Sequence, residues 1–268
     1  MQPILNVQNL TMDFGGIRAL DHLSLQVHSG EIVALIGPNG AGKTTFFNCI
    51  TGIYKPTKGD LLLTPPGKKT KKLNGLKPNK VTEQGLARTF QNIRLFPNMS
   101  VLENVMIGRH CRTKSKIFGA IFRGPRTRRE EEEIVEKSLE ILKKINLDKM
   151  ADEYAKNLPY GAQRRLEIAR ALAINPKFIL LDEPFAGVDP IAVRDIQEIV
   201  AKLKFKNIGI LITDHNVQET LAITDKTYLM FEGGILKEGT PQELAEDETV
   251  RRVYLGKDFE LKKKKFSS

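Results

Sequence analysis

The sequence has little cysteine and no long apolar run, and these absences exclude several classes of protein. Its two cysteines, Cys49 and Cys111, are too few for a disulfide framework. No stretch reaches the roughly 18 uninterrupted apolar residues that a membrane-spanning helix needs, and the N-terminus lacks the basic and apolar regions of a secretory signal. We therefore expect a protein of a reducing compartment that does not cross a bilayer by itself.

The composition is that of an ordinary globular protein with an excess of positive charge. Hydrophobic residues make up 41% of the 268 residues, and 42 Lys and Arg against 32 Asp and Glu give a formal charge of +10. The lysines gather at residues 68–80 and 262–265, without interleaved aromatic residues. We interpret them first as a solvated surface and second as attraction to an anionic membrane surface. No nucleic-acid partner is expected.

Short strands and helices alternate along most of the chain. Apolar residues at every second position, or in short runs, predict strands over residues 4–7, 23–27, 31–36, 178–181, 208–212, 227–231 and 235–237. Helical spacing predicts helices over residues 43–52, 164–174, 192–203 and 218–223, and mostly helical structure over 102–147. Residues 65–80 are expected to form a solvated loop. Strands that alternate with helices indicate a largely parallel sheet.

One segment matches the phosphate-binding loop pattern G-x-x-x-x-G-K-[S/T] and stands between a predicted strand and a predicted helix. Glycines in such a loop allow successive backbone N–H groups to face phosphate oxygens, and the helix N-terminus adds a positive partial charge. Lys43 would reach the β- and γ-phosphates, and the Thr44 hydroxyl would take one Mg²⁺ position. The matching residues are Gly37, Pro38, Asn39, Gly40, Ala41, Gly42, Lys43 and Thr44.

Two other segments place polar residues directly after apolar strands. Asp182 and Glu183 follow the strand at 178–181, and adjacent residues of a continuing strand point to opposite faces. We therefore expect Asp182 to hold Mg²⁺ and Glu183 to polarise the water that attacks the γ-phosphorus. His215 follows another strand, at the end where ligands of open α/β sheets gather. The alternatives are a solvated carboxylate pair and a structural histidine.

Further motifs follow in an order that resembles a known family. They are Arg88-Thr89-Phe90-Gln91, the segment Leu158–Leu172, Ala186–Asp189 and the segment around His215. Together with the phosphate loop and the carboxylates, they resemble the nucleotide-binding subunit of an ATP-binding cassette (ABC) transporter over about residues 4–257. The resemblance implies a P-loop NTPase of α/β fold, with an N-terminal antiparallel β subdomain and an inserted α-helical subdomain.

The resemblance also implies a division of the chain. Residues 1–91 and 159–240 would form the ATPase core, and residues 92–158 the helical subdomain that receives the coupling helix of a membrane subunit. Residues 241–261 would be a C-terminal extension, and residues 262–268 a basic tail.

Roles for single residues follow from the same resemblance. Phe14 would stack on adenine, Gln91 would contact Mg²⁺ and sense the nucleotide, and His215 would be the switch histidine. Gly161 would contact the ATP held by a second copy, and Asp189 would lie in a dimer contact. The implied catalytic residues are Glu183, His215 and Gln91, the metal ligands are Thr44, Gln91 and Asp182, and the nucleotide-binding residues outside the loop pattern are Phe14, Thr45, Tyr160, Gly161 and Asp189.

The signature motif departs from its usual form. Family members usually read Leu-Ser-Gly-Gly-Gln, whereas this chain has Pro159 in place of the serine. Proline removes a hydroxyl and a backbone N–H, which are two donors to phosphate. Because proline suits a first helical turn and the Gly161 N–H remains, we expect a retained but weakened contact.

The implied activity is ATP hydrolysis that drives transmembrane permease subunits. Two copies, or this chain with a related cassette, would close on two ATP molecules at the cytoplasmic face of the bacterial inner membrane. Residues 85–96 and the signature are similar to ATPases of branched-chain amino acid importers, and residues from about 175 are similar to the ATPase of the lipopolysaccharide exporter. We favour the importer, since the helical insert carries the partner surface.

Two other functions are weighed against transport. A soluble ABC ATPase of DNA repair or of the ribosome would need a long coiled-coil insertion or a second cassette, and the sequence has neither. A P-loop kinase does not explain Gln91, the signature and His215 together.

Overall fold

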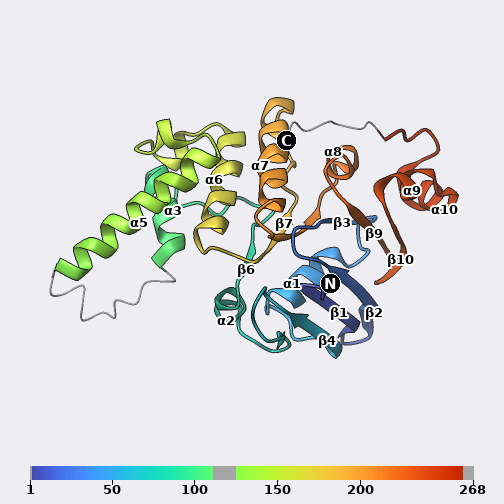
Figure 1. Cartoon of the computed structure of the whole chain (residues 1–268). Coiled ribbons are helices and arrows are strands. Elements are labelled where there is room, and N and C mark those ends of the chain that lie inside the picture. Colours follow the sequence, from blue (N-terminus) through green and yellow to red (C-terminus); the bar gives the residue numbers. More distant parts are fainter. Residues whose placement is uncertain (1, 111–124, 262–268) are drawn as a thin grey trace. The chain divides into compact units, whose positions relative to one another are not determined.

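The computed structural model describes residues 2–110 and 125–261, in two compact units (Figure 1). The first unit comprises residues 1–91, 177–187 and 200–268, and the second comprises residues 92–176 and 188–199. Cys111 and the predicted basic tail at 262–268 lie outside the described residues. No helix in the described part of the chain has the length and apolarity to span a membrane.

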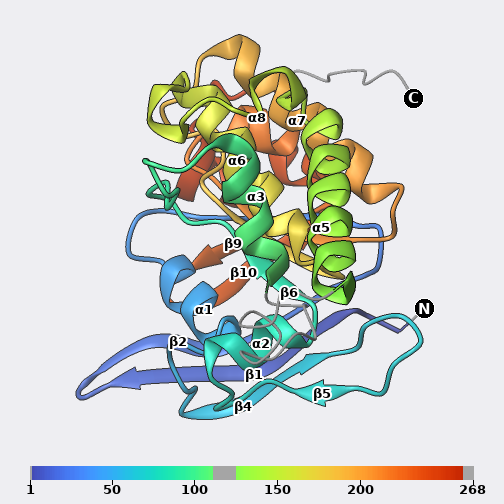
Figure 2. The same ribbon diagram turned by 90° about the vertical axis from the view of Figure 1, so that its left-hand side faces the viewer.

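An antiparallel sheet forms one part of the first unit. Its strand order is β2-β1-β4-β5, and Figure 2 shows β2, β1 and β4 side by side. The strands are β1 (Leu5–Phe14), β2 (Ile17–Val27), β4 (Lys58–Leu63) and β5 (Lys71–Lys72). The first two are longer than predicted, because they continue through exposed polar positions up to the turn at Gly15-Gly16.

A second sheet of the first unit is mostly parallel and has the order β10-β9-β3-β8-β7-β6. Its strands are β3 (Ile32–Ile36), β6 (Leu86–Arg88), β7 (Phe178–Asp182), β8 (Gly209–Thr213), β9 (Lys226–Phe231) and β10 (Gly234–Gly239). Every residue of β3, β7 and β8 is buried, as expected for parallel strands covered on both faces. Because β3, β8 and β7 are parallel neighbours, their carboxyl ends lie along one edge. The predicted parallel sheet and the predicted β9–β10 hairpin are confirmed.

The helices of the first unit include three, α2, α9 and α10, that the sequence analysis did not predict. The unit contains α1 (Lys43–Ile50), α2 (Pro78–Glu83), α8 (Val217–Leu221), α9 (Pro241–Glu246) and α10 (Glu248–Val250), followed by a π-helical turn, η3 (Arg251–Leu255). The prediction of a loop over residues 65–80 was wrong in part, because it missed β5 and the start of α2. Pro78 occupies the first turn of α2, where proline is favourable, and Val81 is buried.

The core of the first unit includes side chains from α1 and both sheets, and Cys49 is one of them. Burial raises the pKa of the Cys49 thiol to about 12. The thiol is therefore a small apolar side chain at neutral pH.

The second unit is helical. It contains α3 (Val101–His110), α5 (Pro125–Lys144), α6 (Tyr160–Ala173), the 3₁₀ turns η1 (Asp148–Met150) and η2 (Ala155–Asn157), and most of α7 (Pro190–Lys204). The buried Asn104 side chain holds the preceding loop against α3, because its amide donates to the carbonyls of Phe96, Met99 and Ser100. Residues 92–158 all fall in this unit, which also takes in 159–176 and 188–199. The subdomain boundaries stay a prediction.

Candidate nucleotide site

The phosphate loop connects β3 to α1. Asn39, Gly40 and Thr44 are exposed, whereas Gly37 is buried where the loop leaves the strand. Gly37 has a φ of 154°, and a Cβ atom there would lie 2.2 Å from the carbonyl oxygen of Met230. No other residue fits at this position without moving the backbone of β9. The loop conformation therefore depends on glycine at its first position.

The Lys43 side chain points back into the phosphate loop and makes hydrogen bonds to its backbone. Its Nζ donates to the carbonyl oxygens of Gly37 at 2.6 Å and of Pro38 at 3.0 Å. Burial lowers the pKa of Lys43, and the negative charge of Glu183 opposes this shift. The amine thus lies within the turn of the loop, and the carboxylate of Glu183, directly after β7, is close enough to influence its pKa.

The two carboxylates at the carboxyl end of β7, Asp182 and Glu183, have different partners. The strand ends at Asp182, and Glu183 has a left-handed φ of 51°, so the predicted alternation along a continuing strand does not apply. Asp182 Oδ2 accepts from Nη2 of Arg88 at 2.7 Å. Glu183 Oε1 lies 3.1 Å from Nε2 of His215, whose side chain is 50% exposed. The two carboxylates therefore lie in different environments, and their different tasks stay a prediction.

Asp214 is a site residue that the sequence analysis missed. Its buried carboxylate accepts from the backbone N–H of Phe185 at 2.7 Å and of Asn216 at 2.8 Å. Burial raises its pKa, although these two N–H groups favour the ionised form. Asp214 therefore links the loop that follows Glu183 to the loop that carries His215. An aspartate directly after an apolar strand was the available signal.

The C-terminal extension also reaches the phosphate loop. A cavity of about 290 Å³ is lined by Gly37, Pro38, Asn39, His215, Val217, Tyr254, Leu255 and Phe259. Burial raises the pKa of the Tyr254 hydroxyl, while a hydrogen bond from the Gly37 backbone opposes the rise. No sequence motif indicated this contact, because it joins residues more than two hundred positions apart in the chain.

Three other candidate residues, Phe14, Gln91 and Thr45, also belong to the first unit. Phe14 ends β1, is 40% exposed, and packs edge-on against Tyr54 with ring centroids 5.2 Å apart. Gln91 is exposed three residues after Arg88, the last residue of β6. Thr45 follows Thr44 in the first turn of α1.

The oxygen donors suit Mg²⁺. Thr44, Gln91 and Asp182 offer a hydroxyl, an amide oxygen and a carboxylate, and Mg²⁺ is typically held by one or two carboxylates together with substrate phosphates. Groups of three or more His, Cys, Asp or Glu that could hold a metal are absent from the described residues. The hydroxyl, amide and carboxylate oxygens fit Mg²⁺ that is held together with nucleotide phosphates.

The signature residues lie in the second unit, at the start of α6. Pro159 is the N-cap of this helix, and no side chain caps it. A Cβ on Gly161 would lie 2.4 Å from Cβ of Ala192 and 3.5 Å from Oδ2 of Asp189. Glycine is thus required where α6 meets the start of α7, and the structure brings Gly161 and Asp189 together.

The side chains of Asp189 and Tyr160 make hydrogen bonds where α6 meets the start of α7. Oδ1 of Asp189 accepts from the backbone N–H of Ile191 at 3.0 Å and of Ala192 at 3.1 Å, at the first turn of α7. The Tyr160 ring is 44% exposed, and its hydroxyl accepts from Arg164 at 2.9 Å.

Comparisons with known proteins agree with this architecture. The family model described as ABC transporter matches residues 20–186. The high-affinity branched-chain amino acid transport ATP-binding protein LivG of Escherichia coli K12 is 41% identical, covering 95% of this chain and 98% of its own. The lipopolysaccharide export system ATP-binding protein LptB of the same organism is 39% identical, covering 96% and 99%. Both similarities extend over nearly the whole chain.

Solved structures of ATP-binding cassettes are also similar to this chain. A crystal structure of the ADP conformation of an ATP-binding cassette of an ABC transporter has a TM-score of 0.82 and 36% identity, covering 96% of this chain and 100% of that one. A dimeric ATP-binding cassette bound to ADP and Pi has a TM-score of 0.72 and 26% identity, covering 88% and 98%. The predicted α/β fold, with its antiparallel β subdomain, is confirmed. The chain belongs to the ABC transporter family, as one of its ATP-binding subunits.

Proposed function

We propose that this ATPase energises the uptake of branched-chain amino acids through separate permease subunits at the cytoplasmic face of the inner membrane. The observation that carries the proposal is the 41% identity to a branched-chain amino acid transport ATP-binding protein over nearly the full length of both chains. Lipopolysaccharide export is the second candidate, because the export ATPase is 39% identical over a similar span.

Phosphate binding in this proposal rests on the loop between β3 and α1. Backbone N–H groups of residues 37–44 would cradle the phosphates, and the N-terminus of α1 would add its partial positive charge. Lys43 would exchange its two carbonyl acceptors for phosphate oxygens. Phe14 would stack on adenine, with Tyr54 supporting its ring.

Hydrolysis in this proposal rests on the residues that would hold Mg²⁺ and on Glu183 and His215, which follow β7 and β8. Thr44, Gln91 and Asp182 would hold Mg²⁺, which neutralises charge on the phosphates. Glu183 would accept a proton from the water that attacks the γ-phosphorus, giving ADP and phosphate. His215, 3.1 Å from Glu183, would hold that carboxylate in place.

Each site would be completed by a second cassette. The phosphate loop and Glu183 belong to the first unit, whereas the signature belongs to the second unit. Gly161, supported by Asp189, would present the N-terminus of α6 to the γ-phosphate of ATP bound by the partner. Closure on two ATP molecules would stabilise one arrangement of the attached permeases, and hydrolysis would release it.

The bound membrane proteins test the proposal directly. The tagged chain is expected to co-purify from detergent-solubilised membranes of its own cells with permeases of the amino acid importer type, identified by mass spectrometry. Reconstituted with them, it should drive ATP-dependent accumulation of leucine in vesicles. Recovery of lipopolysaccharide-exporter permeases would instead support the second candidate, and recovery of ribosomes or DNA would contradict both.

Pro159→Ser is expected to strengthen ATP-driven dimerisation. Serine at the N-cap of α6 restores a hydroxyl and a backbone N–H at the partner's γ-phosphate, and one such hydrogen bond contributes about 1 kcal/mol, or about fivefold in affinity. Light scattering against ATP concentration measures the change, in variants that also carry Glu183→Gln.

Pro159→Ala is the matched control, because it restores the N–H without the hydroxyl. Serine also caps α6 in the free subunit, which stabilises that helix by about 1 kcal/mol, so thermal unfolding is followed in parallel. Equal dimerisation in the serine variant and the unchanged protein would mean that the missing hydroxyl is unimportant.

A further inference from the structure

Arg88, the last residue of β6, forms a buried ion pair with Asp182. Its Nη2 lies 2.7 Å from Oδ2 of Asp182, and the two side chains are only 7% and 10% exposed. The strands that carry them, β6 and β7, are parallel neighbours in the sheet. One oxygen of the Asp182 carboxylate is therefore held, and among the described residues no hydrogen bond to the other oxygen, Oδ1, is found.

The same guanidinium reaches the helix that follows the phosphate loop. Nη1 of Arg88 donates to Oδ1 of Asn48 at 2.8 Å and to Oγ1 of Thr51 at 3.3 Å. Asn48 lies in the last turn of α1, and Thr51 is its C-cap. Arg88, at the end of β6, thus makes hydrogen bonds to both β7 and α1. Gln91 follows β6, Asp182 ends β7, and Lys43 begins α1.

Two aromatic rings restrict the guanidinium further. Its central carbon lies 5.5 Å from the centroid of the Phe47 ring and 5.0 Å from that of Phe90, within cation–π range. Nε of Arg88 is buried without a hydrogen-bond partner in the described structure. A buried ion pair with an unsatisfied donor stabilises a fold poorly, and apolar residues of similar volume often do as well. Stability alone is therefore a weak reason for this arrangement.

We propose that Arg88 is a positioning residue for the metal–nucleotide complex: it fixes the orientation of Asp182 so that Oδ1 meets Mg²⁺. The proposal rests on the role of Asp182 given above. Groups that orient a metal ligand typically change metal affinity by about 10- to 100-fold when they are altered. The planar fork of arginine is needed, since the ammonium of lysine cannot donate along the same fixed directions to Asp182, Asn48 and Thr51.

The test measures metal binding rather than turnover. All proteins carry Glu183→Gln so that ATP persists, and Mn²⁺ binding to the ATP complex is followed by electron paramagnetic resonance. Arg88→Lys is expected to weaken Mn²⁺ binding about tenfold, with ATP affinity in the absence of metal unchanged. Unchanged Mn²⁺ affinity would overturn the proposal, as would an equal loss of metal-free ATP binding, which indicates a merely structural role.

Two further variants keep the outcome decisive. Asn48→Ala removes one hydrogen-bond acceptor of the guanidinium and leaves the ion pair with Asp182, so a smaller loss of Mn²⁺ affinity is expected. If Arg88→Lys does not fold, unchanged Mn²⁺ affinity in Asn48→Ala overturns the proposal. Asp182→Asn distinguishes a failure of the metal-binding role of Asp182 from a failure of the positioning role of Arg88. If it leaves Mn²⁺ binding intact, the assigned role of Asp182 fails, whereas a loss there with none in Arg88→Lys removes only the role of Arg88.

Discussion

Glu183→Gln is expected to lower ATP turnover by about two to four orders of magnitude, because a positioned general base contributes that much to a rate. Glutamine keeps the size of the side chain and can still contact His215, which lies 3.1 Å from Glu183. The phosphate loop is untouched by the change. ATP binding should therefore survive while the proton acceptor for the attacking water is lost.

The same variant is expected to accumulate as an ATP-bound dimer. Hydrolysis is the step that reopens the proposed closed pair, so its loss leaves the closed form populated. Light scattering with Mg²⁺ and ATP should show a dimer for Glu183→Gln and mostly monomer for the unchanged protein during turnover. Phosphate release measures the rate.

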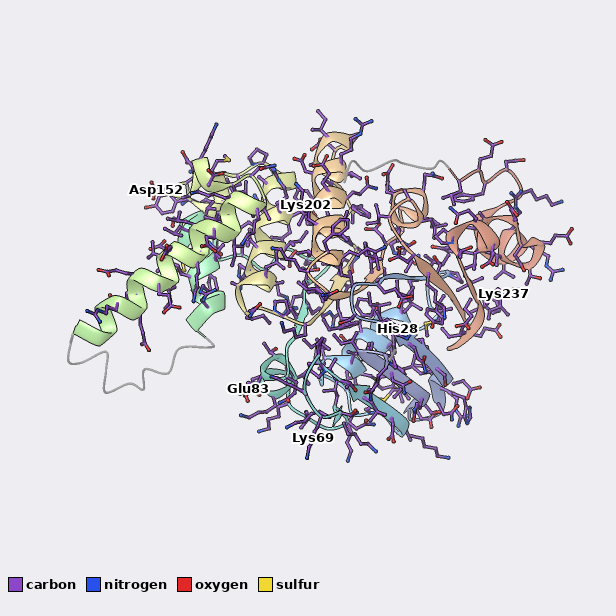
Figure 3. All side chains as sticks on the ribbon, in the orientation of Figure 1. His28, Lys69, Glu83, Asp152, Lys202 and Lys237 are labelled. Carbon is purple, nitrogen blue, oxygen red and sulfur yellow. The ribbon has the colours of Figure 1, made fainter. Side chains whose placement is uncertain are left out.

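The control is Glu83→Gln, at an exposed position on α2, at the rim of the first unit (Figure 3). This change alters the formal charge equally and is expected to leave both turnover and dimerisation unchanged. A Glu183→Gln protein that stays monomeric with ATP, or that hydrolyses it at the normal rate, would remove Glu183 from the proposed catalytic role.

The parts of the site that the sequence predicted are encoded by neighbouring residues. The phosphate loop is one continuous segment whose glycines and lysine are needed at fixed spacing, and its flanking strand and helix were predicted within two residues at each boundary. The strand that ends at Asp182 was recognisable in the same way, from an apolar run followed by carboxylates.

The parts that the sequence did not predict depend on contacts between distant residues. Arg88 and Asp182 are 94 positions apart, and only the pairing of β6 with β7 brings them together. Tyr254 reaches the phosphate loop through a C-terminal extension that carries no motif. The end of the extended backbone at Glu183 was also not predicted, because its left-handed φ is rare for a residue other than glycine.

Lys43→Met is expected to lower ATP affinity by about 10²- to 10³-fold, because Lys43 supplies charge-assisted hydrogen bonds to phosphate, each contributing about 1.5–3 kcal/mol. Methionine keeps an unbranched side chain of similar length but has no donor. Binding of a fluorescent ATP analogue measures the loss. Lys69→Met, at an exposed position in the first unit (Figure 3), removes the same charge and should leave affinity unchanged.

The pH dependence of ATP binding provides a second test of Lys43. Burial lowers the pKa of its amine below the ordinary value of 10.5, and the charge of Glu183 opposes that shift. Only the protonated amine attracts phosphate, so affinity should be full at neutral pH and should fall as pH rises through this lowered pKa. Replacing Glu183 by glutamine removes the opposing charge and should move the fall to lower pH. Lys43→Met lacks the titrating amine and should lose this alkaline decrease; if the decrease persists unchanged in that variant, another group is responsible for it.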